Sequence, residues 1–213
     1  MDIDITQHLG AVTREVVHGE RAGQRTAIVR ASRTYATDQG DLWSALTDPE
    51  RLPRWFAPVT GELRLGGRFQ VEGNAGGEVL ACEAPHRFEI TWEFDGGVSW
   101  VEVRLAPDPV GGTRLTLEHS AIPGGEHWDT YGPGAVGIGW ELALMGMELH
   151  VASGGAGDPA EGRAWAMTPE AAEFMVGSGT AWGDADAASG TDPAEARAKA
   201  ERTNAAYTAA PEA

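Results

Sequence analysis

Alternation of hydrophobic and polar residues dominates the first two thirds of the chain. In residues 87–94 every second side chain is large and apolar, from Phe88 to Phe94, and the residues between them are polar or charged. Other stretches repeat this alternation, at 25–35, 101–105 and 115–119. A period of two is typical of strands with one covered and one wet face. The pattern predicts an antiparallel meander over 59–120, with Glu89 and Glu93 in solvent.

The pattern changes to a helical period in residues 132–151. Apolar side chains form two stripes there, one of Val136, Trp140, Leu144, Met147 and Val151 and another of Ile138, Leu142, Met145 and Leu149. Only a narrow line through Glu141 and Glu148 is polar. A helix this apolar must be covered on most of its circumference. Because one sheet covers one stripe, a second covering element is expected.

Two short helical turns connect the first strand to the meander. The first spans residues 41–47 and ends before Pro49, and Asp48 is expected to cap a second turn that leads to Trp55 and Phe56. Isolated helices of this length are unstable in water, so both turns are expected to pack on another part of the protein.

The last sixty residues suggest a second helical region. A Gly-rich stretch is followed by Thr168-Pro169, a typical helix start, and then by Phe174, Met175 and Trp182 at helical spacing. We expect this tail to cover the second stripe of the long helix, and the alternative is a detached alanine-rich tail. The predicted organisation is an N-terminal extension (1–24), a domain (25–152), a linker (153–167) and a helical tail (168–213).

Composition narrows the functional classes. The 213 residues carry a formal charge of −16, which argues against binding of a phosphate backbone and therefore against nucleic acid as a partner. No apolar run reaches the length of about 18 residues that a spanning helix needs, and the first residues lack the basic start of a signal peptide. We therefore expect a cytoplasmic protein without a membrane partner. The single cysteine, Cys82, suits a reducing compartment and is expected to be a buried, inert thiol rather than a nucleophile.

Several motifs resemble one protein superfamily. The run from Leu42 to Pro49, followed by Leu52 and Trp55-Phe56, resembles the VWxALTDPxxLxxWF signature of the SRPBCC (START-like) superfamily. It is most similar to the branch named after the C-terminal domain of the activator of heat-shock protein 90 ATPase. Three further segments are similar to motifs of this branch, at 63–69 (LRLGGRF), 112–119 (GTRLTLEH) and 139–144 (GWELAL).

The resemblance implies an α+β helix-grip fold. In this fold a curved antiparallel sheet of about six to seven strands wraps around a long C-terminal helix, and a cavity between them holds the functional site. Strand parity and helix stripes then indicate the ligand-binding residues: Phe69, Trp92, Val101, Leu117 and His119 from the sheet, Trp140 and Leu144 from the helix, and Trp55 and Phe56 at the mouth. Each of these residues can equally be ordinary core.

His119 is the most polar of these candidates. In the alternating pattern His119 follows Leu115 and Leu117 on the apolar face of the strand. It is therefore either a polar group inside the cavity or a strand-end histidine bonded to a nearby carbonyl. Arg33 also has the inward parity and needs a carboxylate partner, such as Glu118 or a ligand acid, because an unpaired buried charge is costly. His127 and Asp129 match no metal-ligand spacing. No catalytic residue, metal site or cofactor is predicted.

Three functions remain open from the sequence. The first is binding of a small hydrophobic or aromatic molecule without chemistry, since the expected lining is apolar and aromatic. The second is a cavity enzyme of the polyketide cyclase or hydrolase type that uses His119. The third is a co-chaperone-like interaction domain, and a homodimer is also left open. Fold alone does not choose between them.

The expected role of the tail leads to a first prediction. Truncation after Gly157 removes Phe174, Met175 and Trp182, whose burial contributes about 1.5–3 kcal/mol each, out of a typical total near 5–15 kcal/mol. The truncated protein is therefore expected to aggregate or bind hydrophobic dyes. Solubility and the unfolding midpoint measure this, and a soluble fragment as stable as the full chain contradicts it.

Overall fold

The computed structural model describes residues 3–124 and 126–209, and the chain divides into two compact units. The first unit contains the residues up to 31, 122–142 and those from 160 onwards. The second contains 32–121 and 143–159. Each unit is described by itself below.

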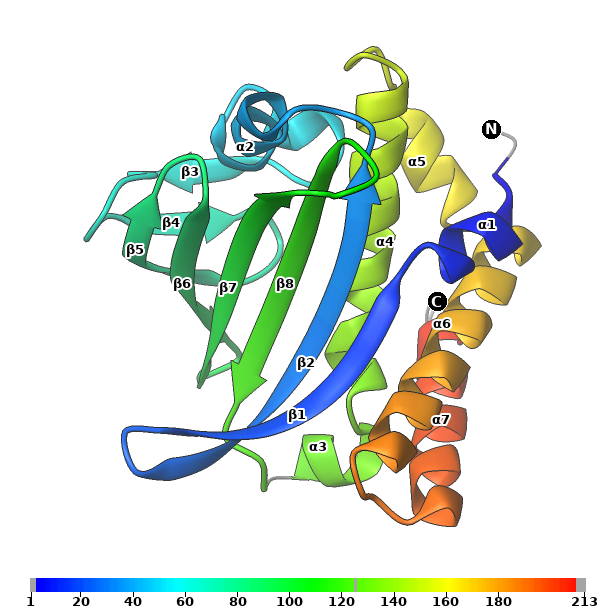
Figure 1. The fold of residues 1–213 in the computed structure, drawn as a ribbon. Helices are drawn as coiled ribbons and strands as arrows, with labels where there is room; N and C mark the ends of the chain where they lie inside the picture. Colours follow the sequence, from blue (N-terminus) through cyan, green and yellow to red (C-terminus); the bar gives the residue numbers. More distant parts are fainter. Residues whose placement is uncertain (1–2, 125, 210–213) are drawn as a thin grey trace. The chain divides into compact units, whose positions relative to one another are not determined.

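The helices and strands follow the order expected for an α+β chain (Figure 1). In sequence they are α1 (Ile5–Gly10), β1 (Thr13–Arg21), β2 (Gln24–Tyr35), α2 (Gln39–Thr47), the 3-10 helix η1 (Leu52–Arg54), β3 (Val59–Gly61), β4 (Arg68–Val71), β5 (Gly76–Glu83), β6 (Arg87–Phe94), β7 (Gly97–Pro107), β8 (Thr113–Ala121), α3 (Glu126–Tyr131), α4 (Gly134–Ala152), α5 (Pro159–Trp165), α6 (Pro169–Ala188) and α7 (Pro193–Thr208). Within the described part of the chain, no helix is both long and apolar enough to cross a membrane.

The strands form one eight-stranded sheet in the order β1-β2-β8-β7-β6-β5-β4-β3. The pairs that join β3 through β8 are antiparallel, as the alternation predicted. In β7 and β8 the side chains on the inward face are buried. They include Val101, Val103, Leu115, Leu117 and His119. The sheet has more strands than the six to seven expected, because residues 13–21, which carry little pattern, form β1.

Two expectations about the strands are wrong. Phe94 shares the parity of Trp92 but is 58% exposed, because it flanks the two-residue turn Asp95-Gly96 at the tip of a hairpin. Cys82 is exposed rather than buried. A register shift between Val79 and Ala81 interrupts the buried parity of β5 and places Cys82 near the end of the strand. The alternation of hydrophobic and polar residues therefore identified the strands, but it did not show which residues near the strand ends are exposed to solvent.

Glu89, expected in solvent, is only 15% exposed at its side chain, because its carboxylate pairs with Arg87 at 3.0 Å. Arg87 also reaches Glu102 at the same distance, so these charges form a network across β6 and β7.

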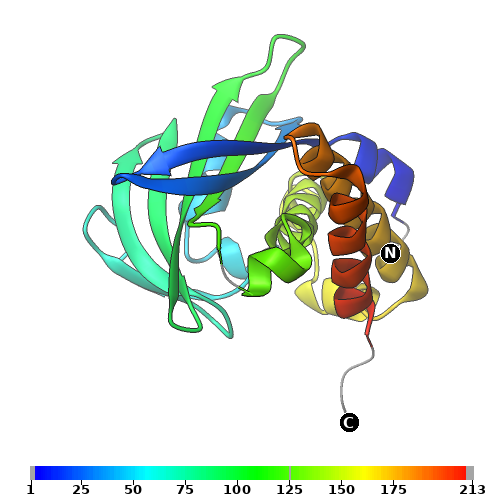
Figure 2. The ribbon, with the colours of Figure 1, turned by 90° about the horizontal axis from the view of Figure 1, so that it is seen from below.

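In the first unit, α6 and α7 lie side by side (Figures 1 and 2). Thr168 caps α6 through a hydrogen bond from Ala171 N, as the Thr-Pro signal indicates. The fully buried indole of Trp182 packs on the first half of α4 at Gly137, where a Cβ would lie 2.4 Å from the ring. From α7, Tyr207 donates its hydroxyl to Ala135 O at 2.9 Å. Only glycine at position 137 lets the ring approach the helix this closely.

The segment expected as a linker contains a helix of its own. In α5, Trp165 is buried and stacks edge-on against Phe174 of α6, with 6.2 Å between the ring centroids. Edge-to-face packing of two aromatic rings adds to the stability that burial alone provides. The Gly-rich part of the segment, 153–157, precedes α5.

A buried ion pair joins β1 to α4 in the same unit. Arg14 donates from Nε and Nη2 to the two carboxylate oxygens of Glu141, both at 2.6 Å, and the Glu141 side chain is fully buried. Arg14 also donates to Val12 O and Leu9 O at 3.0 Å each. A bidentate pair with additional acceptors satisfies a charge that an apolar helix could not otherwise bury.

The geometry of this pair yields a stability prediction. Arg14→Met should destabilise the protein by about 3–5 kcal/mol, because it leaves the Glu141 carboxylate buried without its counter-ion. The double variant Arg14→Met/Glu141→Met should recover most of this loss, since both charges are then absent. Urea unfolding of the three proteins measures the effect. A double variant as unstable as the single one contradicts the electrostatic explanation.

Candidate functional site

Three of the expected ligand residues meet in one apolar cluster of the second unit. Phe69 is buried at its centre, and Phe56 and Trp92 pack around it with their side chains only partly covered. The other members are also apolar: Val71, Val79, Ala57, Val59, Leu63 and Ile90. Trp55 adjoins this group through Phe56, with ring centroids 5.4 Å apart. We call Trp55, Phe56, Phe69, Trp92 and His119 the aromatic cluster.

Strand pairing brings Phe69 to this position. It lies opposite Gly77 in the β4–β5 ladder, and a Cβ at Gly77 would meet Thr91 O at 2.0 Å. The missing side chain lets β5 lie close to β6. Phe69 on β4 is thereby brought near Trp92 on β6.

Trp55 is held at three points. Its indole N–H donates to Ala45 O at the end of α2, 3.0 Å away. Its carbonyl lies against the second half of α4 at Gly146, where a Cβ would be 2.7 Å from the oxygen. The ring then packs on Phe56. The two short helical turns thus position the aromatic pair that the sequence predicted to close them.

His119 joins the cluster through Trp92. The two rings are arranged edge to face with centroids 6.4 Å apart, and His119 is 5% exposed. His119 Nε2 lies 2.8 Å from Ser99 Oγ. Because Ser99 donates its single proton to Trp92 O, at 3.1 Å, His119 Nε2 must be the donor to Ser99. Nε2 of His119 therefore carries a proton.

Burial lowers the pKa of His119 to about 4. Desolvation of the charged imidazolium by burial is the cause.

The remaining predicted site residues are distributed more widely. Val101 lies directly opposite His119 in the β7–β8 ladder, and Leu117 lies opposite Val103, all of them buried. Leu144 is buried in the second half of α4, and its carbonyl accepts a hydrogen bond from Tyr35 at 3.0 Å. Trp140 belongs to the first unit, in the half of α4 on which α6 and α7 pack, and it is partly exposed.

Two polar interactions were not predicted from the sequence, that of Ser99 with His119 and that of Glu148 with Arg33. Ser99 lies on the same inward face of β7 as Val101. A polar residue among the apolar residues of that face is the signal that could have identified it. Glu148 proves to be a partner of Arg33, 3.5 Å away, and the Arg33 guanidinium also lies over the Tyr35 ring. Burial raises the pKa of Tyr35 well above its ordinary range. Among the residues that the structure describes, no three His, Cys, Asp or Glu side chains gather as metal ligands.

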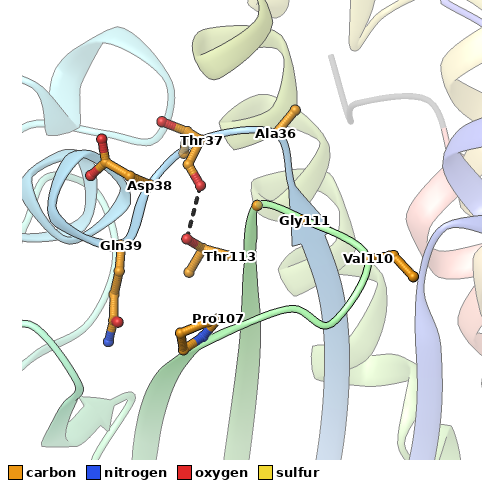
Figure 3. A pocket seen from close by; sticks show the side chains of 9 residues that line it. Ala36, Thr37, Asp38, Gln39, Pro107, Val110, Gly111 and Thr113 are labelled. Carbon is orange, nitrogen blue, oxygen red and sulfur yellow. Dashed lines mark hydrogen bonds between the residues drawn. The ribbon is translucent and has the colours of Figure 1, made fainter.

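A depression open to solvent lies at the opposite end of β7 from His119 (Figure 3). It is lined by the start of α2 and by the β7–β8 turn, where Thr113 donates to Thr37 O at 2.8 Å. The polar groups of its walls are already used within the fold. Asp38 caps α2, and Gln39 donates to Pro85 O and Leu105 O. The depression contains none of the predicted ligand residues and offers no reactive group.

The shifted pKa of His119 predicts a pH dependence of stability. The unfolded chain binds a proton near pH 6.5, whereas folded His119 does so only near pH 4. The stability present above pH 6.5 should therefore fall by about 3 kcal/mol as the pH drops towards 4. His119→Gln should remove this part of the slope, and His18→Gln, at an exposed position, should keep it. Urea midpoints between these pH values measure the difference, and parallel curves for all three proteins contradict the assignment.

Comparison with known proteins places these features in a family. The family model described as Activator of Hsp90 ATPase homolog 1-like protein matches residues 36–152, more than half of the chain. A search of curated proteins found no match.

Solved structures agree with this match. The crystal structure of CalU16 from Micromonospora echinospora is 31% identical with a TM-score of 0.67, and the alignment covers 82% of this chain and 98% of CalU16. Its solution structure gives 30% identity and a TM-score of 0.64 over 84% of this chain and 97% of that one. The crystal structure of MLL2253 from Mesorhizobium loti is 25% identical with a TM-score of 0.50, over 57% of this chain and 94% of MLL2253.

The alignment with CalU16 covers more of the chain than residues 36–152, so part of this similarity lies outside the family match. The matched region contains the motifs around Trp55-Phe56. It also contains or overlaps the antiparallel sheet and the long helix α4. The chain therefore has the helix-grip fold and belongs to the Activator of Hsp90 ATPase homolog 1-like family.

Proposed function

We propose that the protein binds a small, uncharged hydrophobic or aromatic molecule at the aromatic cluster. This proposal rests on the partial burial of Phe56 and Trp92, which pack against the cluster that contains the buried Phe69, and of Trp55, which packs on Phe56. Large aromatic side chains contribute most when they are fully buried, and a bound apolar molecule would complete their burial. Ligand sites typically combine such a surface with a few polar groups.

The polar groups beside the cluster favour a neutral ligand. His119 is uncharged above about pH 4, and its neighbour Ser99 is a neutral hydroxyl. The aromatic cluster itself contains no carboxylate, ammonium or guanidinium group. An anionic or cationic ligand would lose its hydration there without gaining a counter-ion, which is costly.

Acid–base catalysis by His119 receives less support. A general base works best when its pKa lies near the working pH, and a pKa of about 4 makes His119 a weak base at neutrality. Its Nε2 proton is also engaged with Ser99 Oγ. An interaction domain of the co-chaperone kind would use exposed surface instead, and the binding experiment separates the two.

Titration with a neutral dye, N-phenyl-1-naphthylamine, tests the proposal in the full-length protein at neutral pH. We expect saturable fluorescence enhancement with the wild type. Phe56→Ala and Trp92→Ala should weaken binding by roughly tenfold or more, since each removes contact area worth more than about 1.4 kcal/mol. Leu65→Ala is the matched control, because Leu65 is 61% exposed outside the cluster and should leave the affinity unchanged.

Thermal unfolding with and without dye checks that each variant is folded and that the dye binds the native state, which then unfolds at a higher temperature. An anionic naphthalene sulfonate of similar size should bind more weakly than the neutral dye. Absence of binding to the wild type contradicts the proposal. Equal binding by Trp92→Ala and Leu65→Ala would place the dye elsewhere, for example on an exposed apolar surface.

A further inference from the structure

His150, near the end of α4, contacts the segment that holds Trp55. It is 2% exposed, and its Nε2 lies 3.3 Å from Nη2 of Arg51. Arg51 immediately precedes η1, and Trp55 immediately follows it. The contact therefore joins α4 to the same short segment that supplies Trp55 and Phe56 to the aromatic cluster.

The chemistry of this contact determines the protonation state of His150. A guanidinium can only donate hydrogen bonds, so His150 Nε2 must accept from Arg51 and cannot carry a proton. The neutral ring then carries its proton on Nδ1. An imidazolium would present an N–H to the Arg51 N–H, and the hydrogen bond would be replaced by repulsion between two cations.

The charges around His150 act in the same direction. Burial and the nearby guanidinium groups of Arg51 and Arg54 lower the pKa of His150, and the Asp41 carboxylate partly opposes them. Asp41 pairs with Arg51 at 2.8 Å. Although its own partial burial opposes ionisation, hydrogen bonds from Thr37 and Arg51 hold the pKa of Asp41 below its ordinary value, so it stays charged in mild acid.

The remaining neighbours of His150 carry no charge. The turn after α4 approaches the ring at Gly155, where a Cβ would be 3.4 Å from Cε1. Ser153 donates its hydroxyl to His150 O at 3.1 Å. Among the described residues of the second unit, the charged groups that face His150 are thus Arg51 and Arg54 beside η1 and Asp41 on α2.

We propose that His150 is an acid-sensitive latch on the ligand site: neutral His150 holds Arg51 and the segment 51–56 in place, and its protonation releases this segment with Trp55 and Phe56. The inference rests on the proposed ligand function for its consequence, which is weaker ligand binding in acid. One proton is taken up by His150 Nε2, and one hydrogen bond, from Arg51, is lost. The carbonyl of Trp55 then loses its close packing on Gly146.

The pH window separates this effect from the titration of His119. Burial and the neighbouring guanidinium groups lower the pKa of His150 from its ordinary value, whereas His119 remains neutral down to about pH 4. A change in dye binding between about pH 7.5 and about pH 5 therefore does not come from His119.

Titration of the full-length protein with N-phenyl-1-naphthylamine across this window tests the latch. For the wild type we expect the dissociation constant to rise in acid, by at most about tenfold per pH unit, the limit for one proton. His150→Gln should bind with less than about twofold change, because the amide oxygen accepts from Arg51 but does not titrate. His18→Gln, at an exposed position, should follow the wild type.

Hydrogen exchange of the amides in 51–56, corrected for the intrinsic effect of pH, provides a readout that needs no ligand. These amides should lose protection in acid in the wild type and keep it in His150→Gln. Equal acid responses of the two proteins overturn the latch. If the dye binds neither protein at any pH while exchange behaves as expected, the ligand function fails and the latch stands.

Discussion

Helix α4 has to be covered around nearly its whole circumference, and the rest of the structure depends on this requirement. Its sequence is apolar on two stripes, so water cannot solvate either side favourably. The first half is covered by α6 and α7, with Trp182 on Gly137, and the second half by the segment after η1, with the Trp55 carbonyl on Gly146. In both places a glycine lets a segment distant in sequence reach the helix backbone. A helix that lacked either cover would expose a large apolar surface.

The same requirement explains the two carboxylates on this helix. Glu141 pairs with Arg14 from β1, and Glu148 pairs with Arg33 from β2. A carboxylate on a covered helix is tolerated only with a counter-ion and hydrogen bonds, because its desolvation is otherwise uncompensated. The two pairs fix which residues of the first two strands lie against α4. Such a pair adds little to net stability, since hydrophobic replacement of a whole pair is often neutral.

The candidate ligand site and its proposed control share one segment of the chain. Residues 51–56 carry Arg51, which contacts His150, and the aromatic pair Trp55-Phe56, which adjoins Phe69 and Trp92. This segment is short and contains a single turn of 3-10 helix. Its side-chain and close-packing contacts to neighbouring elements include the Trp55 indole on Ala45 O, the Trp55 carbonyl on Gly146, and Arg51 on Asp41 and His150.

The sequence by itself determined the strands of the meander, the long helix, the helix start at Thr168 and the family, because each of these follows from periodicity, capping residues or a contiguous motif. It also indicated that Phe69, Trp92 and His119 share a face, since parity is a local property. Tertiary structure alone decided that 13–21 pairs as an edge strand and that Cys82 and Phe94 are exposed. It also decided three interactions, those of Ser99 with His119, of Glu148 with Arg33 and of Arg51 with His150. Parity states which face a side chain occupies, but partners depend on register, bulges and the approach of segments far apart in the chain. Those are set by the packing of whole elements, and no local pattern encodes them.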